Sequence, residues 1–145
     1  MALSDAALIV ARCQKVSLKL ATEAITTEMK TLAGQGFVAR VCAVLQGRTR
    51  ELPELERILS SHPLLHTAEG IFYRQVLISA SEPTGMQVLQ VPERELEVRL
   101  AAALHLPADR ILPRLTALGR GLGSPWTADQ KLAAGAAWLA LVLQP

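Results

Sequence analysis

His62 and His66 are four residues apart, and Glu69 follows the second histidine by three. Two imidazoles and a carboxylate are side chains that can bind Zn²⁺ or a related metal ion. Pro63 stands between the histidines and predicts a break in the single helix that an i, i+4 pair needs in order to chelate a metal. Because the sequence contains no other matching cluster of ligands, we expect no metal site and no cofactor.

Arg57 and His62 form an Arg-x-x-x-x-His pattern near a predicted helix end. The pattern resembles the catalytic motif of the HEPN family of helical nucleases, in which each of two protomers contributes a charged pair to a site at the dimer interface. The resemblance implies an RNA-cleaving site that contains these two residues. The family usually has a polar residue directly after the arginine, whereas this chain has Ile58 there.

Signatures of other enzymes are absent from the sequence. It contains no Gly-x-Gly-x-x-Gly motif, no phosphate-binding loop, no Gly-x-Ser-x-Gly and no Cys-x-x-Cys. Gly119, Gly121 and Gly123 follow a predicted helix instead of a strand, which favours a hinge over a nucleotide-binding loop. An enzyme is therefore the least favoured of the three function classes that we consider.

Two groups of basic residues are candidates for binding nucleic-acid phosphates. Arg12, Lys15 and Lys19 are three and four residues apart, so they share one side of the first predicted helix. Arg110 and Arg114 would face outward from the second helix of residues 98–118, a segment that resembles a helix-turn-helix.

This helix-turn-helix resemblance has two departures. Pro113 lies within the second helix, which we expect it to kink. His105 occupies the turn, where glycine is usual.

The spacing of apolar residues predicts six helices. The first runs from about residue 5 to residue 32, and the second covers residues 37–45. The others begin near Pro53, Pro92 and Asp109, and after the capping box Thr127-x-x-Gln130. The first helix has two apolar stripes, one formed by Ile9, Cys13, Val16 and Leu20 and one by Leu18, Ala21, Ile25 and Leu32.

The stretch from residue 71 to residue 91 is the densest in strand-favouring residues, and we interpret it as a β-hairpin. Both faces of this hairpin are apolar, so it needs a cover from helices or from a partner. The last helix is apolar nearly all round, which is typical of a helix buried in its domain or in a partner. The predicted interaction residues are Phe72, Tyr73, Val76, Leu89, Val91 and Trp138.

Composition indicates one α+β domain over residues 1–145, predominantly helical, with about six helices and one β-hairpin near residues 71–91. Hydrophobic residues make up 50% of the chain and aromatic residues 3%, so the core must be aliphatic. The net charge of +2 argues against a dominant nucleic-acid surface. Residues 1–50 carry seven Lys or Arg against three Asp or Glu, whereas residues 51–100 carry four against eight.

A cytoplasmic location is expected. Cys13 and Cys42 are too few for a disulfide framework, and the start of the chain lacks a signal-peptide pattern. The apolar run of residues 132–143 is shorter than the roughly 20 residues that span a bilayer.

The two ends of the chain also resemble the small helical subunit of type III CRISPR effector complexes in layout. The resemblance rests on a first helix that ends near Gly34 and Gly36, a following helix with Phe37 and Leu45, and an aromatic residue, Trp138, in the closing helix. It does not extend to the middle 60 residues of the chain.

The sequence favours a non-enzymatic subunit that binds a protein partner or itself, as part of a larger complex or a homo-oligomer. The alternative is a nucleic-acid-binding module that uses residues 98–118 and the basic face of the first helix. We expect no membrane association and no cofactor.

Overall fold

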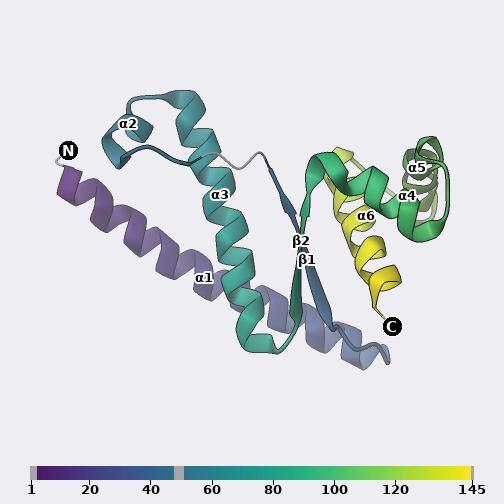
Figure 1. Ribbon diagram of the computed structural model, residues 1–145. Coiled ribbons are helices and arrows are strands. Elements are labelled where there is room, and N and C mark those ends of the chain that lie inside the picture. The colour runs from purple at the N-terminus through teal and green to yellow at the C-terminus, as the bar shows by residue number, and fades with distance from the viewer. Residues whose placement is uncertain (1–2, 48–50, 145) are drawn as a thin grey trace. The chain divides into compact units, whose positions relative to one another are not determined.

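The computed structural model describes residues 3–47 and 51–144 (Figure 1). It is 74% helical, with six α-helices and one two-stranded parallel sheet in these residues, which confirms the predominantly helical α+β class. The helices are α1 (Leu3–Gly34), α2 (Leu55–Leu59), α3 (His62–Ser81), α4 (Leu96–Leu104), α5 (Ile111–Leu122) and α6 (Ala128–Leu143). The strands are β1 (Val41–Gln46) and β2 (Gln87–Pro92), and short 3-10 turns cover residues 82–84, 93–95 and 108–110.

The chain divides into two compact units. Within the described residues, the first unit comprises residues 3–40 and 51–87, and the second comprises residues 41–47 and 88–144. The first unit therefore holds α1, α2 and α3, whereas the second holds α4, α5, α6 and nearly all of the sheet. This division describes packing within the chain, and the expectation of a single domain stays a prediction.

The predicted β-hairpin near residues 71–91 is wrong. Its first half belongs to α3, a helix of 20 residues, and only its end forms strand β2. The exposed positions of α3 include His62, His66, Glu69 and Tyr73, spaced four, three and four residues apart. This helical period outweighs the local richness in β-branched and aromatic residues, because it gives the helix one face to bury and one face for solvent.

The predicted helix over residues 37–45 is also wrong, because this segment contains strand β1. The amide of Gln87 donates a 2.9 Å hydrogen bond to the carbonyl of Arg40 just before β1 begins. At the other end of the pair, the Gln46 side chain donates to the side chain of Gln90 at 2.9 Å. Helices α2 and α3 connect the two strands, as a parallel pair requires a long crossover.

Helix α1 is the longest element of the described chain, with 32 residues, and it packs on α3 in the first unit (Figure 1). It ends at Gly34 as predicted, and Gly36 follows with a φ of +85°, a left-handed conformation that glycine adopts without a Cβ clash.

The second unit has an aliphatic core under α4, α5, α6 and the sheet. Its buried residues are Val91, Leu96, Leu100, Ala101, Ile111, Leu115, Ala136 and Leu139. Gly135 permits close packing here, because a Cβ at this position would lie 3.2 Å from side-chain atoms of both Leu96 and Leu115. The capping box that links Thr127 and Gln130 at the start of α6 is confirmed.

Pro113 does not kink α5. The helix begins at Ile111, so Pro113 lies in its first turn, where a backbone N–H has no intrahelical acceptor. His105 ends α4 in the left-handed conformation, with a φ of +54°, and so makes the turn that glycine usually makes.

Candidate interaction surface

Helix α1 has two apolar faces on opposite sides. With 3.6 residues per turn, the stripe of Ile9, Cys13, Val16 and Leu20 lies about 160° from the stripe centred on Leu18 and Ile25. Leu18 and Ile25 are half-buried on the side of α1 that packs on α3. All four residues of the other stripe are exposed, and we call this stripe the outward face of α1.

The outward face exposes large apolar side chains. Ile9 and Val16 are each 51% exposed, and Leu20 is 58% exposed. Cys13 lies between them as an exposed free thiol. Cys42, on β1, is half-buried.

The interior of the first unit is thin. Among the described residues of this unit, the buried apolar side chains are Ala6, Ile58, Val76 and Ala80. Its exposed large apolar residues outnumber them: Leu3, Leu8, Ile9, Val10, Val16, Leu20, Phe37, Val38, Leu59, Tyr73 and Leu77. A unit with this balance has surface left to bury, which is typical of a protein that associates.

Basic side chains line one edge of the outward face. Arg12, Lys15 and Lys19 are exposed, and helical geometry places them within about 60° of one another on the same side of the stripe. Lys19 forms an ion pair with Glu23 at 3.9 Å. The structure therefore groups these three predicted residues, next to an apolar stripe instead of on a purely polar face.

Arg110 and Arg114 belong to the second unit. Arg110 closes the 3-10 turn before α5, Arg114 lies in the first turns of α5, and both are exposed. Over the segment that resembles a helix-turn-helix, α4 is followed by a 3-10 turn and by α5.

The six predicted interaction residues differ in exposure. Tyr73 is 59% exposed, and Phe72 beside it is half-buried with the two rings edge to face at 5.3 Å. Val76 and Val91 are buried within their own units. Leu89 and Trp138 are half-buried against the core of the second unit.

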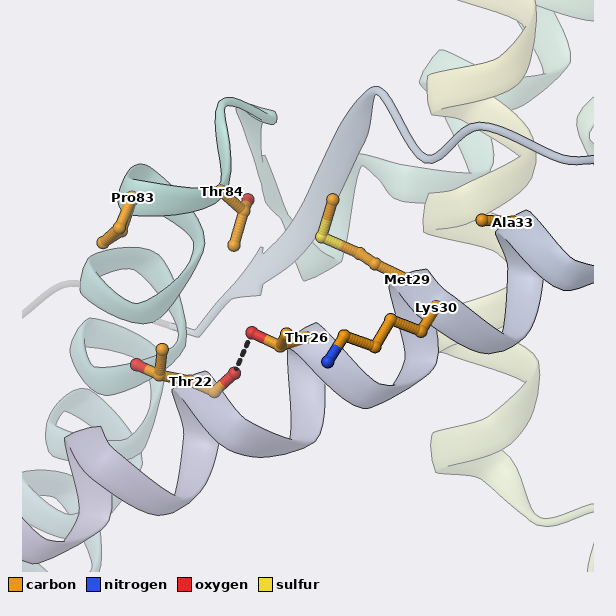
Figure 2. Close-up of a pocket in the computed structure, with 7 residues that line it drawn as sticks. All are labelled: Thr22, Thr26, Met29, Lys30, Ala33, Pro83 and Thr84. Carbon is orange, nitrogen blue, oxygen red and sulfur yellow. Dashed lines mark hydrogen bonds between the residues drawn. The ribbon is translucent and has the colours of Figure 1, made fainter.

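A hollow of about 460 Å³ opens in the first unit between α1 and the 3-10 turn after α3 (Figure 2). Thr22, Thr26, Met29, Lys30, Ala33, Pro83 and Thr84 line it. The hydroxyl of Thr26 donates to the carbonyl of Thr22 at 2.7 Å, and that of Thr22 donates to Leu18 at 2.8 Å. Because α1 already uses these donors, the hollow offers a ligand few polar partners.

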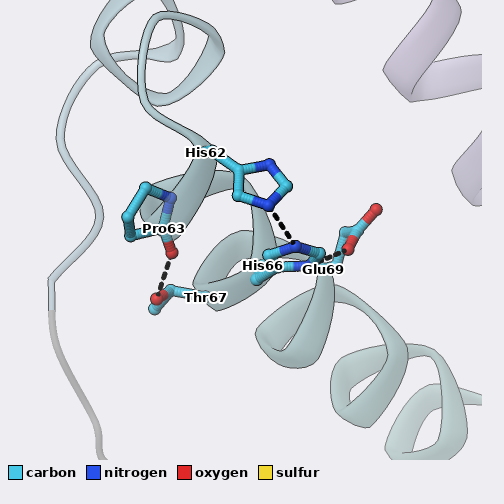
Figure 3. A network of polar contacts seen from close by, with 5 residues as sticks. All are labelled: His62, Pro63, His66, Thr67 and Glu69. Carbon is cyan, nitrogen blue, oxygen red and sulfur yellow. Dashed lines mark hydrogen bonds and ion pairs between the residues drawn. The ribbon is translucent and has the colours of Figure 1, made fainter.

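His62, His66 and Glu69 form a chain of polar contacts at the start of α3 (Figure 3). The Nε2 atoms of the two histidines are 3.1 Å apart, and His66 Nδ1 is 3.1 Å from Glu69 Oε2. Arg57 lies on α2 and His62 begins α3, so the Arg-x-x-x-x-His pattern spans two helices.

The sequence shows both apolar stripes of α1 but does not indicate which of them another element covers. The missing signal was the number of packing partners: opposite stripes on one helix need two covers, and in the first unit the long helix that packs on α1 is α3.

No helix in the described residues is long and apolar enough to cross a membrane. No family model, no curated protein and no solved structure matches the chain.

Proposed function

We propose that this chain is a non-enzymatic assembly subunit in which the outward face of α1 binds a helix of a partner protein. The observation that carries the proposal is the pair of opposite apolar faces on α1, of which one packs on α3 and the other is exposed. The thin interior of the first unit supports the same conclusion, since a bound helix would bury part of its exposed apolar surface.

The spacing of the outward face matches a helical partner. Ile9, Cys13, Val16 and Leu20 are separated by four, three and four residues, the spacing of a coiled-coil seam. Each aliphatic member is about half exposed, so full burial would contribute roughly 1 kcal/mol per side chain. Three such side chains, with a central cysteine, make a contact that an amphipathic helix can cover.

Charge indicates which helix binds there. The cations Arg12, Lys15 and Lys19 follow one edge of the outward face, so a partner helix with acidic residues beside its apolar stripe is favoured. An antiparallel second copy of α1 would set these cations against each other. We therefore propose a different, acidic protein as the partner, and a homodimer is the competing outcome of the test.

The test compares two matched double variants in the cells that produce the protein. Val16→Asp with Leu20→Asp places charges in the outward face, whereas Thr27→Asp with Thr31→Asp places the same charges on exposed positions further along the same side of α1. The proposal predicts a stoichiometric complex that the control variant retains and the Val16/Leu20 variant loses. It also predicts weaker binding at high salt, because the cationic edge is screened.

Mass measured by light scattering separates the outcomes. A heteromeric mass that depends on Val16 and Leu20, with an acidic helix identified in the partner, supports the proposal. A homodimeric mass would mean that the outward face binds a second copy of this chain instead of a different protein. If this chain is a monomer both after purification and in a nuclease-treated native extract of the cells, the proposal is contradicted.

Nucleic-acid binding is a second candidate, favoured by the exposure of Arg110 and Arg114 one helical turn apart in the α4–α5 segment. In a gel-shift titration at several salt concentrations, Arg110→Ala with Arg114→Ala would abolish binding. Arg94→Ala with Arg120→Ala removes the same charge from other exposed positions of the second unit and would leave it unchanged. Equal binding by both double variants would exclude this surface.

A cytoplasmic location belongs to the same proposal. The exposed Cys13 and the half-buried Cys42 are both free thiols, which suits a reducing compartment.

A further inference from the structure

We propose that His62 and His66 bind a divalent transition-metal ion of the Zn²⁺ type through their Nε2 atoms, with Glu69 orienting the ring of His66. This site lies on α3 and is independent of the outward face of α1. Its residues contact each other and form a chain from a carboxylate through two imidazoles (Figure 3).

Pro63 does not prevent chelation, contrary to the expectation from the sequence. Helix α3 begins at His62, and Pro63 lies in its first turn, where the missing N–H costs no intrahelical hydrogen bond. His62 and His66 therefore lie one turn apart on the same face of one helix. Their ring centroids are 4.4 Å apart, with the ring planes at 78°.

The separation of the two nitrogens suits a shared metal ion. Zn–N bonds of 2.0–2.1 Å in a tetrahedral site place two ligand nitrogens about 3.3 Å apart. The Nε2 atoms of His62 and His66 are 3.1 Å apart, close to this separation. A shared ion would lie to one side of the line between them, so each ring would turn from its partner toward the ion. Two histidines at this spacing on one helix face are a common arrangement for binding zinc.

Glu69 fixes the tautomer of His66 that can bind a metal ion. An ionised carboxylate only accepts hydrogen bonds, so its 3.1 Å contact with Nδ1 holds the proton of the neutral ring on that atom. The lone pair of Nε2 is then directed toward His62. Without metal, the Nε2–H of His62 donates into this lone pair. When a metal ion binds, the proton of His62 moves to its Nδ1 and both Nε2 atoms become ligands.

The site has open coordination positions. The described part of the chain contains no group of three or more His, Cys, Asp or Glu side chains that could hold a metal. The ion would therefore have two protein ligands, with water in its other positions. The side chains of His66 and Glu69 are 65% and 62% exposed, so an ion can enter and leave freely. We expect an exchangeable ion, held less tightly than in a structural site with four protein ligands.

The test is a titration of the full chain with Zn²⁺, monitored by calorimetry and by the ¹⁵N resonances of the imidazole rings. A Cys13→Ser background removes the exposed thiol as a competing ligand. We expect one ion per chain, with shifts of the Nε2 resonances of His62 and His66. His62→Ala and His66→Ala should each weaken binding at least tenfold, and Glu69→Ala roughly tenfold, as expected for loss of an orienting carboxylate.

The control variant is His105→Asn, which removes the third histidine of the chain at an exposed position with positive φ that asparagine tolerates. It should bind Zn²⁺ like the parent, and Mg²⁺, which prefers oxygen ligands, should leave the imidazole resonances in place. Circular dichroism verifies that the variants fold. His66→Gln is a second substitution at the same position, used if His66→Ala does not fold. Parental affinity in His62→Ala or His66→Ala would show a hydrogen-bonded pair only and overturn the proposal.

Discussion

The indole of Trp126 lies directly against Gly119, and a Cβ on that glycine would be 2.6 Å from the Nε1 atom of the ring. The same Nε1 atom donates a 2.9 Å hydrogen bond to the carbonyl of Leu115. The Trp126 side chain thus packs the segment before α6 against α5. This contact requires glycine at position 119, because a Cβ there would overlap the indole ring.

Gly119→Ala should destabilise the protein for this reason. Alanine would push the Trp126 ring away and break its hydrogen bond to Leu115, with a loss of about 1–3 kcal/mol in the free energy of unfolding. Gly121→Ala is the matched control, because a Cβ there meets nothing within 4 Å. It should stabilise α5 by roughly 0.5–1 kcal/mol. Urea denaturation measures both, and a neutral Gly119→Ala would contradict the packing described.

The core of the second unit should depend strongly on Ile111. This side chain is fully buried at the start of α5, whereas its neighbour Leu112 is 51% exposed. Ile111→Ala should lower the free energy of unfolding by about 2–5 kcal/mol through lost burial and a cavity. Leu112→Ala should cost less than about 1 kcal/mol. Thermal denaturation of the two variants checks the difference, and equal losses would mean that α5 is rotated.

The capping box at α6 gives a third measurable effect. The Thr127 side chain accepts a hydrogen bond from the backbone N–H of Gln130, and the side-chain oxygen of Gln130 accepts one of 2.9 Å from the backbone N–H of Thr127. Alanine at position 127 removes the first of these bonds. Thr127→Ala should cost about 1 kcal/mol, as for other N-cap residues. Thr116→Ala makes the same substitution at an exposed position inside α5 and should be neutral or slightly stabilising, since alanine is the better helix former. A loss from Thr116→Ala as large as that from Thr127→Ala would exclude the capping role.

Local signals in the sequence were sufficient for several elements. The end of α1 near Gly34 and the capping box at Thr127 both follow from backbone chemistry within a few residues. Strand β1 does not, because it forms only with β2, whose first residue, Gln87, is more than 40 positions away along the chain. Helix α3 was missed because aromatic and β-branched residues at 71–78 favour strands individually, while the period of its exposed face is helical.

The candidate sites show the same limit. The sequence placed Arg12, Lys15 and Lys19 on one side of a helix, and the structure agrees. It could not tell which of the two α1 stripes packs on α3, because that depends on tertiary contacts. It also treated Pro63 as a helix breaker, although the boundary of α3 places this residue in a first turn.

Thiol labelling of Cys13 tests the central claim most directly, because this residue lies within the outward face of α1. In the purified chain, N-ethylmaleimide should label Cys13 faster than the half-buried Cys42. In intact cells, mass spectrometry should show Cys13 protected relative to Cys42, with protection lost in the Val16→Asp and Leu20→Asp variant and kept in the Thr27→Asp and Thr31→Asp variant. Equal labelling of Cys13 in cells and in the purified chain would contradict a covered outward face.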